Sequence, residues 1–316
     1  MSTLLSAVLK TDVSQFALDA QRGLGGRGQK TLPSTYLYDA IGSALFDVIT
    51  LLPEYGLTRA DERVLAGCAG ELASLTSGSL SVAELGSGSG RKTRRILEAL
   101  GGRCTAYYPI DVSDAALEAC EKELGAIADV RPLRGSYLEG LSQAAVKSEE
   151  PMLLLFLGST IGNFGIVEAA DFLKSIRAWL KPGDRLLLGA DLLKPVDRML
   201  AAYDDSIGAT AAFSKNVLAR INRELSGNFD VQSFAHEARW NAGAKRIEMH
   251  LRSGSAQVVQ VAGEEFFFRE GETIWTESSH KFTLEDLDDL AVRSGWTPVR
   301  KWVDAEWPFA NCLWRV

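Results

Sequence analysis

The chain has 316 residues, of which 46% are hydrophobic and 24% are charged, and this composition is typical of a folded protein with a large core. At about 150 residues per domain, the length predicts two domains or one large α/β domain with an insertion. The 34 basic and 41 acidic residues give a net charge of −7, which disfavours the basic surface that non-specific nucleic-acid binding requires.

The first third of the chain is predicted to be helical around a glycine-rich segment. Gly23 to Gly28 read GLGGRG, like a phosphate-binding loop, but no strong strand precedes them and no GK[ST] ending follows. A flexible loop is therefore the expected structure. Two amphipathic stretches follow and predict helices over Ile41–Leu52, which Pro53 ends, and over Arg59–Leu75.

From about residue 80 onward, short apolar strands alternate with helices. The predicted strands are Leu80–Leu85, Thr105–Ile110, Met152–Leu157, Arg185–Ala190, Thr297–Val303 and Asn311–Val316, and the predicted helices are Arg91–Leu100, Ser113–Ile127, Ile166–Leu180 and Leu284–Ser294. This alternation indicates an α/β fold with a doubly wound, mostly parallel sheet.

Between about residues 195 and 283 the alternation breaks. A long helix is predicted over Ala209–Leu225, and strands with one polar face are predicted over Phe229–Trp240, Arg246–Arg252 and Ala256–Val261. We therefore expect an inserted α+β lobe that binds the substrate. The expected boundaries are residues 61–195 and 284–316 for the core, and residues 1–60 and 196–283 for the lobe.

Several features indicate a cytoplasmic protein without a bound metal. Residues 1–16 lack a basic region and a small-residue cleavage site, so we expect no signal peptide. No run of about 18 apolar residues is present, so we expect no membrane span. The four cysteines are scattered and none of the three histidines has metal-ligand spacing, so we expect reduced thiols and no metal.

The strongest local signal is the segment Val82–Gly90, VAELGSGSG. A strand, alternate glycines and a helix together form a turn that a nucleotide-type ligand can approach closely. The dinucleotide fingerprint GxGxxG fails, because Arg91 stands at its last glycine. The GxGxG spacing, with Glu84 two residues before Gly86, instead resembles the first motif of class I S-adenosylmethionine-dependent methyltransferases and their Rossmann-like sheet. A glycine turn without a ligand is the alternative.

Two polar residues follow other predicted strands. Asp111 ends the next strand, where an acid accepts hydrogen bonds from ribose hydroxyls, and it can also cap the helix that follows. Asn163 follows the strand Met152–Leu157, and ligands of open α/β sheets bind beyond the carboxyl ends of such strands. The alternative is that Asn163 only stabilises a turn. The proline motif of nucleic-acid amino-methyltransferases is missing after Asn163.

Six segments, in this order, resemble the L-histidine Nα-methyltransferases of ergothioneine biosynthesis, a histidine-specific methyltransferase family. They are Leu32–Asp61, Ala83–Leu97, Phe156–Phe164, Ala202–Leu225, Arg246–Ser253 and Glu272–Phe282, and they span nearly the whole chain. The resemblance implies that S-adenosyl-L-methionine methylates the α-amino nitrogen of L-histidine three times, giving hercynine.

The same resemblance implies roles for individual residues. Among the substrate residues, Tyr55 would line the histidine site, and Asn163 and Tyr203 would hold the α-amino and carboxylate groups. Glu277 and Ser279 would bind the imidazole, and Met249 would pack nearby. The cofactor residues would be Glu84, Gly86, Gly88, Lys92 and Asp111, with Ser136 and Tyr137 where the family often has an acid. Independently of the resemblance, the attacking amine needs no strongly perturbed base, so we expect a tyrosine hydroxyl, of Tyr55 or Tyr203 as catalytic residue, or a water to relay its proton.

Two rival functions stay open. One is an S-adenosylmethionine-dependent N-methyltransferase of another small amino acid such as tryptophan. The other is a catalytically inactive cofactor-binding protein. Nucleic acid is not an expected partner, because the net charge is negative and the proline motif is missing.

Overall fold

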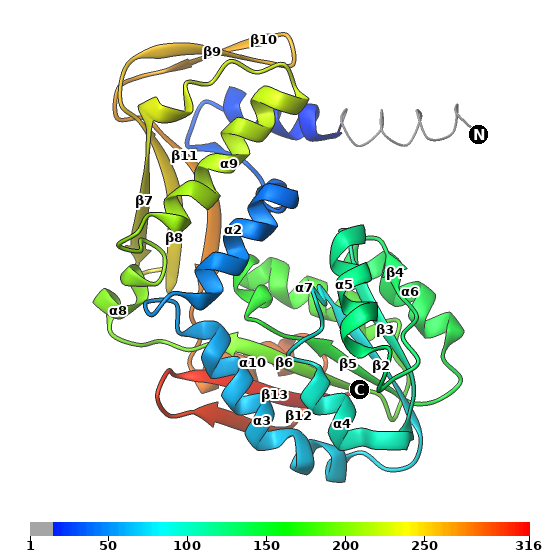
Figure 1. Ribbon diagram of the computed structural model, residues 1–316. Helices are drawn as coiled ribbons and strands as arrows, with labels where there is room; N and C mark the ends of the chain where they lie inside the picture. The colour runs from blue at the N-terminus through cyan, green and yellow to red at the C-terminus, as the bar shows by residue number, and fades with distance from the viewer. Residues whose placement is uncertain (1–14) are drawn as a thin grey trace, which may run out of the picture. The chain divides into compact units, whose positions relative to one another are not determined.

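The computed structural model describes residues 15–316, which divide into two units (Figure 1). The core unit comprises Gly56–Leu193 and His280–Val316, and the lobe unit comprises residues 15–55 and Lys194–Ser279. The expectation of no signal peptide rests mainly on residues 1–14, which lie outside the described residues. Within residues 15–316, none of the helices is long and apolar enough to cross a membrane.

A seven-stranded sheet with the order β12-β13-β6-β5-β2-β3-β4 runs through the core unit. Its strands are β2 (Leu80–Leu85), β3 (Cys104–Asp111), β4 (Leu133–Arg134), β5 (Met152–Phe156), β6 (Arg185–Asp191), β12 (Thr297–Asp304) and β13 (Phe309–Arg315). β2 to β6 pair in parallel, whereas β13 is antiparallel to β6 and to β12. The predicted doubly wound, mostly parallel sheet is confirmed.

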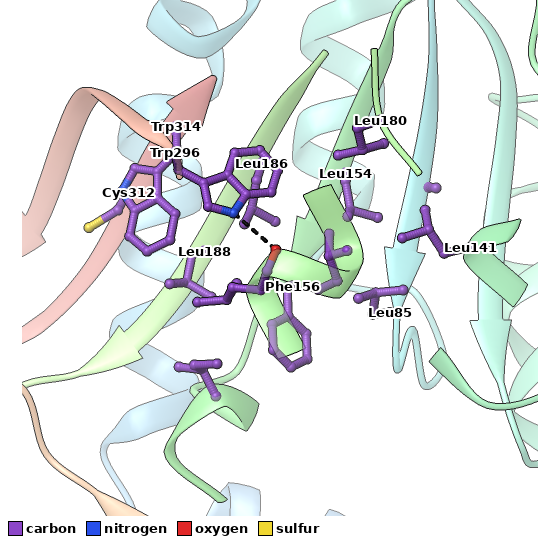
Figure 2. Packing of buried hydrophobic residues seen from close by; sticks show 14 of the residues in the cluster. Leu85, Leu141, Leu154, Phe156, Leu180, Leu186, Leu188, Trp296, Cys312 and Trp314 are labelled. Atoms are coloured by element: carbon purple, nitrogen blue, oxygen red, sulfur yellow. Dashed lines mark hydrogen bonds between the residues drawn. The ribbon is translucent and has the colours of Figure 1, made fainter. Parts of the chain in front are cut away.

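Helices cover both faces of this sheet. Its helical segments are α3 (Leu57–Leu75), α4 (Arg94–Leu100), η2 (Gly101–Arg103), α5 (Asp114–Leu124), α6 (Tyr137–Lys147), η3 (Thr160–Asn163), α7 (Ile166–Arg177) and α10 (Leu284–Arg293). Successive strand residues point to opposite faces. Leu153 and Leu155 accordingly pack with α3, α4 and α5, whereas Leu154 and Phe156 pack with α6, α7 and α10. Figure 2 shows the second of these clusters, in which Trp296 and Trp314 lie near Leu186, Leu188 and Cys312.

Helix α6 was not predicted from the sequence. It contains Gly140, which weakens the helical signal. A Cβ at Gly140 would lie 2.3 Å from Cγ2 of Ile110 on β3, so the close packing of α6 on the sheet requires glycine there. Gly140 therefore weakens the helical pattern in the sequence and at the same time allows the helix to pack on β3.

The lobe unit has the expected α+β composition. Its four-stranded sheet has the order β1-β11-β8-β7, and a separate hairpin pairs β9 with β10. The strands are β1 (Lys30–Thr31), β7 (Phe234–Asn241), β8 (Arg246–Ser253), β9 (Gln257–Val261), β10 (Glu264–Phe268) and β11 (Thr273–His280); the helical segments are η1 (Ser34–Leu37), α2 (Ala40–Leu51), α8 (Val196–Ala201), α9 (Ala209–Glu224), η4 (Val231–Ser233) and residues 15–25. α2 packs against α9 (Figure 1).

Two local predictions in the lobe unit were right only in part, since residues 26–28 lie outside any helix or strand, as the predicted loop requires, but the residues before them do not. The predicted loop at Gly23–Gly28 is helical through residue 25, and a Cβ at Gly23 would lie 2.1 Å from the carbonyl oxygen of Thr31. The glycine therefore serves a close backbone contact inside a helix. The strand predicted from Phe229 begins only at Phe234, because the Asp230 side chain accepts the Gln232 N–H and starts the short helix η4.

All four cysteines are free thiols, as expected from their scattered positions. Cys68, Cys120 and Cys312 are buried, and Cys104 is half-buried. Burial raises the pKa of the Cys68 thiol to about 12, with help from the Asp61 carboxylate, and burial raises the pKa of Cys120 to about 11. Because the thiolate is the reactive form, these side chains act as apolar core residues.

Candidate functional site

The core unit has a candidate ligand-binding edge where its strand order reverses. The chain runs outward from β2 to β3 and β4 and then returns to β5 on the other side of β2. Ligands of open α/β sheets bind beyond the carboxyl ends of the strands at such a switch point. The segment that follows β2 is the glycine turn, and the segment that follows β5 carries Gly158 and Asn163.

The glycine turn needs its alternate glycines for conformational reasons. Gly86, Gly88 and Gly90 have φ angles of +70°, +52° and +69°, a region that L-residues rarely adopt. The Gly86 N–H donates to the carbonyl of Ile110 at 2.8 Å, so the hydrogen bonds between β2 and β3 continue to the first glycine of the turn. Nothing lies within 4 Å of a Cβ built at Gly88, so this part of the turn has open space beside its backbone.

Asp111 at the end of β3 forms a hydrogen bond with the backbone of the glycine turn. Its Oδ2 accepts the Gly88 N–H at 3.2 Å and its Oδ1 accepts the Ser113 N–H at 2.9 Å. The predicted helix cap is wrong in detail, because Ser113 is the N-cap of α5 and accepts the Ala116 N–H through its own hydroxyl at 3.3 Å. Each carboxylate oxygen has a second lone pair, so Asp111 can still accept hydrogen bonds from ribose hydroxyls.

Tyr137 lies beside the glycine turn, whereas Ser136 is the N-cap residue of helix α6. The hydroxyl of Tyr137 is 3.3 Å from the position of a Cβ at Gly86, and burial, with Asp111, raises its pKa to about 12. It therefore stays a protonated hydrogen-bond donor. Ser136 is exposed at the start of α6, where its N–H and hydroxyl both donate to the Glu139 carboxylate, at 3.0 and 2.7 Å.

Glu84 is buried beneath the turn. Its Oε2 accepts hydrogen bonds from Thr93 Oγ1 at 2.6 Å and from the Tyr107 hydroxyl at 2.5 Å. Burial raises the pKa of Glu84 to about 7, although these two bonds and Lys92 lower it. Because only 3% of Glu84 is exposed, its geometry fits a residue that shapes the turn rather than one that contacts a ligand.

Lys92 follows the turn and forms an ion pair that sequence reasoning missed. Its Nζ lies 2.7 Å from Oδ2 of Asp61, a fully buried residue of α3. Burial lowers the pKa of Lys92, but the carboxylates of Asp61 and Glu84 outweigh it and the pKa is raised. The Lys92 ammonium therefore stays charged, with 27% of its side chain exposed. A single acid in an amphipathic helix reads as a solvent-facing residue, so the sequence carries no separate signal for Asp61.

Asn163 ends the short helix η3 and is half-buried. The segment before it is constrained in two ways. Ser159 adopts the left-handed conformation, with a φ of +63°, and Gly162 packs closely on the backbone of His280, since a Cβ at Gly162 would lie 2.9 Å from the His280 carbonyl oxygen. Asn163 belongs to the core unit, whereas the other predicted substrate residues belong to the lobe unit.

In the lobe unit, the structure brings Tyr55, Tyr203 and Ser279 together. The two tyrosine rings meet edge to face with centroids 6.0 Å apart, and the Tyr203 hydroxyl is 2.7 Å from the Ser279 hydroxyl. His236 on β7, which was not predicted, bonds the Tyr203 carbonyl through Nε2 at 2.8 Å. All three predicted residues are less than 10% exposed, at 8%, 7% and 5% respectively. The cluster offers aromatic faces and hydroxyl groups within one buried region.

Glu277 lies two residues before Ser279 on β11. Its Oε1 is 3.4 Å from the Tyr38 hydroxyl, and its carbonyl accepts the Trp275 indole N–H at 2.9 Å. Met249, on the neighbouring strand β8, is 1% exposed, and its carbonyl accepts the Thr276 hydroxyl at 3.2 Å. The residues with alternate spacing on β11 thus contact two tyrosines of the same unit, Tyr38 and Tyr203.

Comparison with known proteins agrees with this geometry. Residues 16–316 match the model of the family described as histidine-specific methyltransferase, SAM-dependent. The chain is 39% identical to the histidine N-alpha-methyltransferase of Mycolicibacterium smegmatis over 99% of both chains, and 39% identical to that of Mycobacterium tuberculosis over 96% and 97% of the two chains. It is also 32% identical to the ergothioneine biosynthesis protein 1 of Neurospora crassa, with 87% of this chain matching 32% of that longer protein.

The fold confirms the resemblance found in the sequence, since the sheet has the switch point and glycine turn that a class I methyltransferase needs. The family match extends through both units. The chain belongs to the family of histidine-specific, S-adenosylmethionine-dependent methyltransferases.

Proposed function

We propose that this protein transfers three methyl groups from S-adenosyl-L-methionine to the α-amino nitrogen of L-histidine and releases hercynine for ergothioneine biosynthesis. The observation that carries the proposal is the match to the histidine-specific family over residues 16–316. The names of its relatives, histidine N-alpha-methyltransferase and ergothioneine biosynthesis protein 1, agree with it.

The residues at the edge of the core sheet fit S-adenosylmethionine. The glycine turn allows close approach of a ligand to the backbone at Gly88, and Asp111 keeps lone pairs for ribose hydroxyls. The charged Lys92 would attract the carboxylate of the cofactor's amino-acid part, and Tyr137 would line the turn at Gly86. Bound there, the cofactor supplies an electrophilic methyl group on its sulfonium centre.

Glu277 and Ser279 would bind the imidazole ring. Neutral imidazole has one N–H donor and one acceptor nitrogen, and a carboxylate and a hydroxyl match these two groups. The buried Met249 would close one side of the pocket. Selectivity for histidine then follows, because an amino acid without these ring groups would leave the polar side chains unpaired.

Tyr203 and Asn163 would hold the α-amino and carboxylate groups, and Tyr55 would line the space around the nitrogen. The amine has to be neutral to attack a methyl carbon. Deprotonation at neutral pH costs about 1–3 kcal/mol, because amino groups titrate only one or two units higher. The Tyr203 hydroxyl, bonded to Ser279, can pass this proton on without a perturbed base. The trimethylated product has a fixed positive charge, which the face of Tyr55 stabilises by about 0.5–2 kcal/mol.

The free thiols are consistent with a reducing compartment, and the cytoplasm is the proposed location. The proposed chemistry needs no metal ion and no nucleic-acid partner, since the methyl donor is already activated.

Mass spectrometry tests the function directly. The purified protein is incubated with S-adenosylmethionine and an equimolar mixture of the twenty amino acids. We expect successive gains of one methyl group on histidine alone, up to three. Methylation of tryptophan in preference to histidine would show a different acceptor, and binding of S-adenosylhomocysteine without any methylation would show an inactive cofactor-binding protein.

A further inference from the structure

Asp61 of α3 connects segments on both sides of the switch point. The residue is fully buried, at 0% exposure. Its Oδ2 accepts the Lys92 ammonium at 2.7 Å and the Gly158 N–H at 3.2 Å, and its Oδ1 accepts the Asn311 amide N–H at 3.1 Å. Lys92 follows the glycine turn after β2, Gly158 follows β5, and Asn311 lies on β13.

The contacts at Oδ2 are mutually dependent. Gly158 has a φ of +72°, and a Cβ there would lie 3.3 Å from Nζ of Lys92, so the backbone after β5 passes directly beside the ammonium group. Oδ2 of Asp61 therefore positions both the Gly158 backbone and the Lys92 ammonium group. A buried carboxylate without its cation is strongly unfavourable, which gives the arrangement one preferred geometry.

We propose that Asp61 is a positioning residue for the cofactor: it holds the Lys92 ammonium and the Gly158 backbone at the spacing that S-adenosylmethionine requires. Being fully buried, Asp61 acts through these groups and not by contact with the ligand. The proposal rests on the proposed function only in taking the core edge as the cofactor site, and it does not depend on which amine is methylated.

The test is the affinity of Asp61→Asn for S-adenosylhomocysteine, measured by isothermal titration calorimetry on the full chain. The substitution keeps the shape of the side chain and removes its charge. Since a hydrogen bond to a charged group is lost, the affinity should fall about 10- to 100-fold. In turnover, KM for S-adenosylmethionine should rise by a similar factor, whereas kcat at saturation and KM for the amino acid should change much less.

Asp184→Asn is the matched control. Asp184 is also buried, at 5% exposure, and it accepts the Met152 and Lys181 N–H groups, both at 2.7 Å, beside the amino end of β5. This variant should lower the unfolding temperature and leave the affinity for S-adenosylhomocysteine unchanged. Equal losses of affinity in both variants would mean that Asp61 only stabilises the fold, and would overturn the proposal.

A double-mutant cycle identifies the route. In the background of Lys92→Met, Asp61→Asn should weaken binding much less than it does in the wild type, because the two residues act together. Fully additive losses would overturn coupling through Lys92. If Asp61→Asn does not fold, Asn311→Ala replaces it: loss of the bond to Oδ1 should weaken binding about 2- to 10-fold, and unchanged binding would contradict the proposal.

The readout separates this proposal from the proposed function. If the wild type binds S-adenosylhomocysteine but does not methylate histidine, the assigned reaction fails and the role of Asp61 is still decided by the affinities. A wild type that does not bind S-adenosylhomocysteine overturns both.

Discussion

The two units build their candidate sites from different groups. The core unit uses backbone groups and carboxyl groups: three glycines with positive φ, the buried carboxyl groups of Asp61 and Glu84, and the half-buried carboxylate of Asp111. The lobe unit uses side chains: Tyr38, Tyr55 and Tyr203 around two polar groups of β11.

This difference indicates how each site can vary. A site made of backbone conformation and buried charge is coupled to the fold, so a small change there alters stability and binding together. A site made of side chains on one strand face can change its selectivity with little change in fold. The core unit should therefore be sensitive to single substitutions, and the lobe unit should set the choice of amino acid.

The largest expected effect is that of Gly90→Ala in the glycine turn. A Cβ at Gly90 would lie 2.6 Å from both Cys120 Sγ and Leu124 Cδ1, at a φ of +69°. Backbone strain and overpacking together should cost about 2–5 kcal/mol of the free energy of unfolding, measured with urea. Gly78→Ala is the control, with a φ of +70° and open space around the Cβ, and should cost only about 1–2 kcal/mol. Equal losses would show that packing against α5 does not matter.

Glu277→Gln tests selectivity in the lobe unit. It replaces a charged acceptor and should lower kcat/KM for histidine about 10- to 100-fold. The affinity for S-adenosylhomocysteine should stay unchanged, which calorimetry measures. An equal loss of affinity for both ligands would remove the proposed division of roles between the two units.

The pH dependence of stability tests the buried carboxylate of the core unit. The pKa of Glu84 is raised from 4.5 to about 7 in the folded protein, so its contribution to stability is full below pH 4.5 and is lost as the pH rises through 7. Relative to Glu84→Gln, the wild type should lose about 1–3 kcal/mol between pH 4.5 and 8, measured by urea unfolding. A constant difference across this range would mean that Glu84 titrates normally.

The smallest expected effect concerns the hydroxyl pair of the lobe unit. Ser279→Ala and Tyr203→Phe each remove one partner of the 2.7 Å contact and should lower kcat/KM for histidine about 2- to 10-fold. The double variant should lose less than the product of the two single losses. Ser278→Ala, at the alternate position of the strand, is the control and should be neutral. A loss in Ser278→Ala equal to that in Ser279→Ala would contradict the assigned strand face.

Much of the core fold could be predicted from the sequence. Continuous apolar segments such as Met152–Phe156 are typical of parallel strands buried on both faces, and the alternate glycines mark the turn. Helix α6 could not be predicted, because Gly140 weakens its helical pattern. The reason for a glycine there, close contact with Ile110 of β3, is visible only in the fold. Asp61 could not be predicted either, since its partners lie 31, 97 and 250 residues away in the chain.

The candidate site of the lobe unit was less accessible to sequence reasoning. The spacing of Glu277 and Ser279 indicates a shared strand face, but their roles came from the family resemblance. The contacts with Tyr38 and Tyr203 span 239 and 76 residues, and no local pattern encodes them.

The most direct test of the central claim locates the methyl groups on the product. Histidine is converted to completion with S-adenosylmethionine, and the product is fragmented by tandem mass spectrometry. If Glu277 and Ser279 bind the imidazole, all methyl groups should lie on the α-amino nitrogen, and fragmentation should release trimethylamine. A methyl group on an imidazole nitrogen would contradict the account, because the ring and not the amine would then have faced the methyl donor.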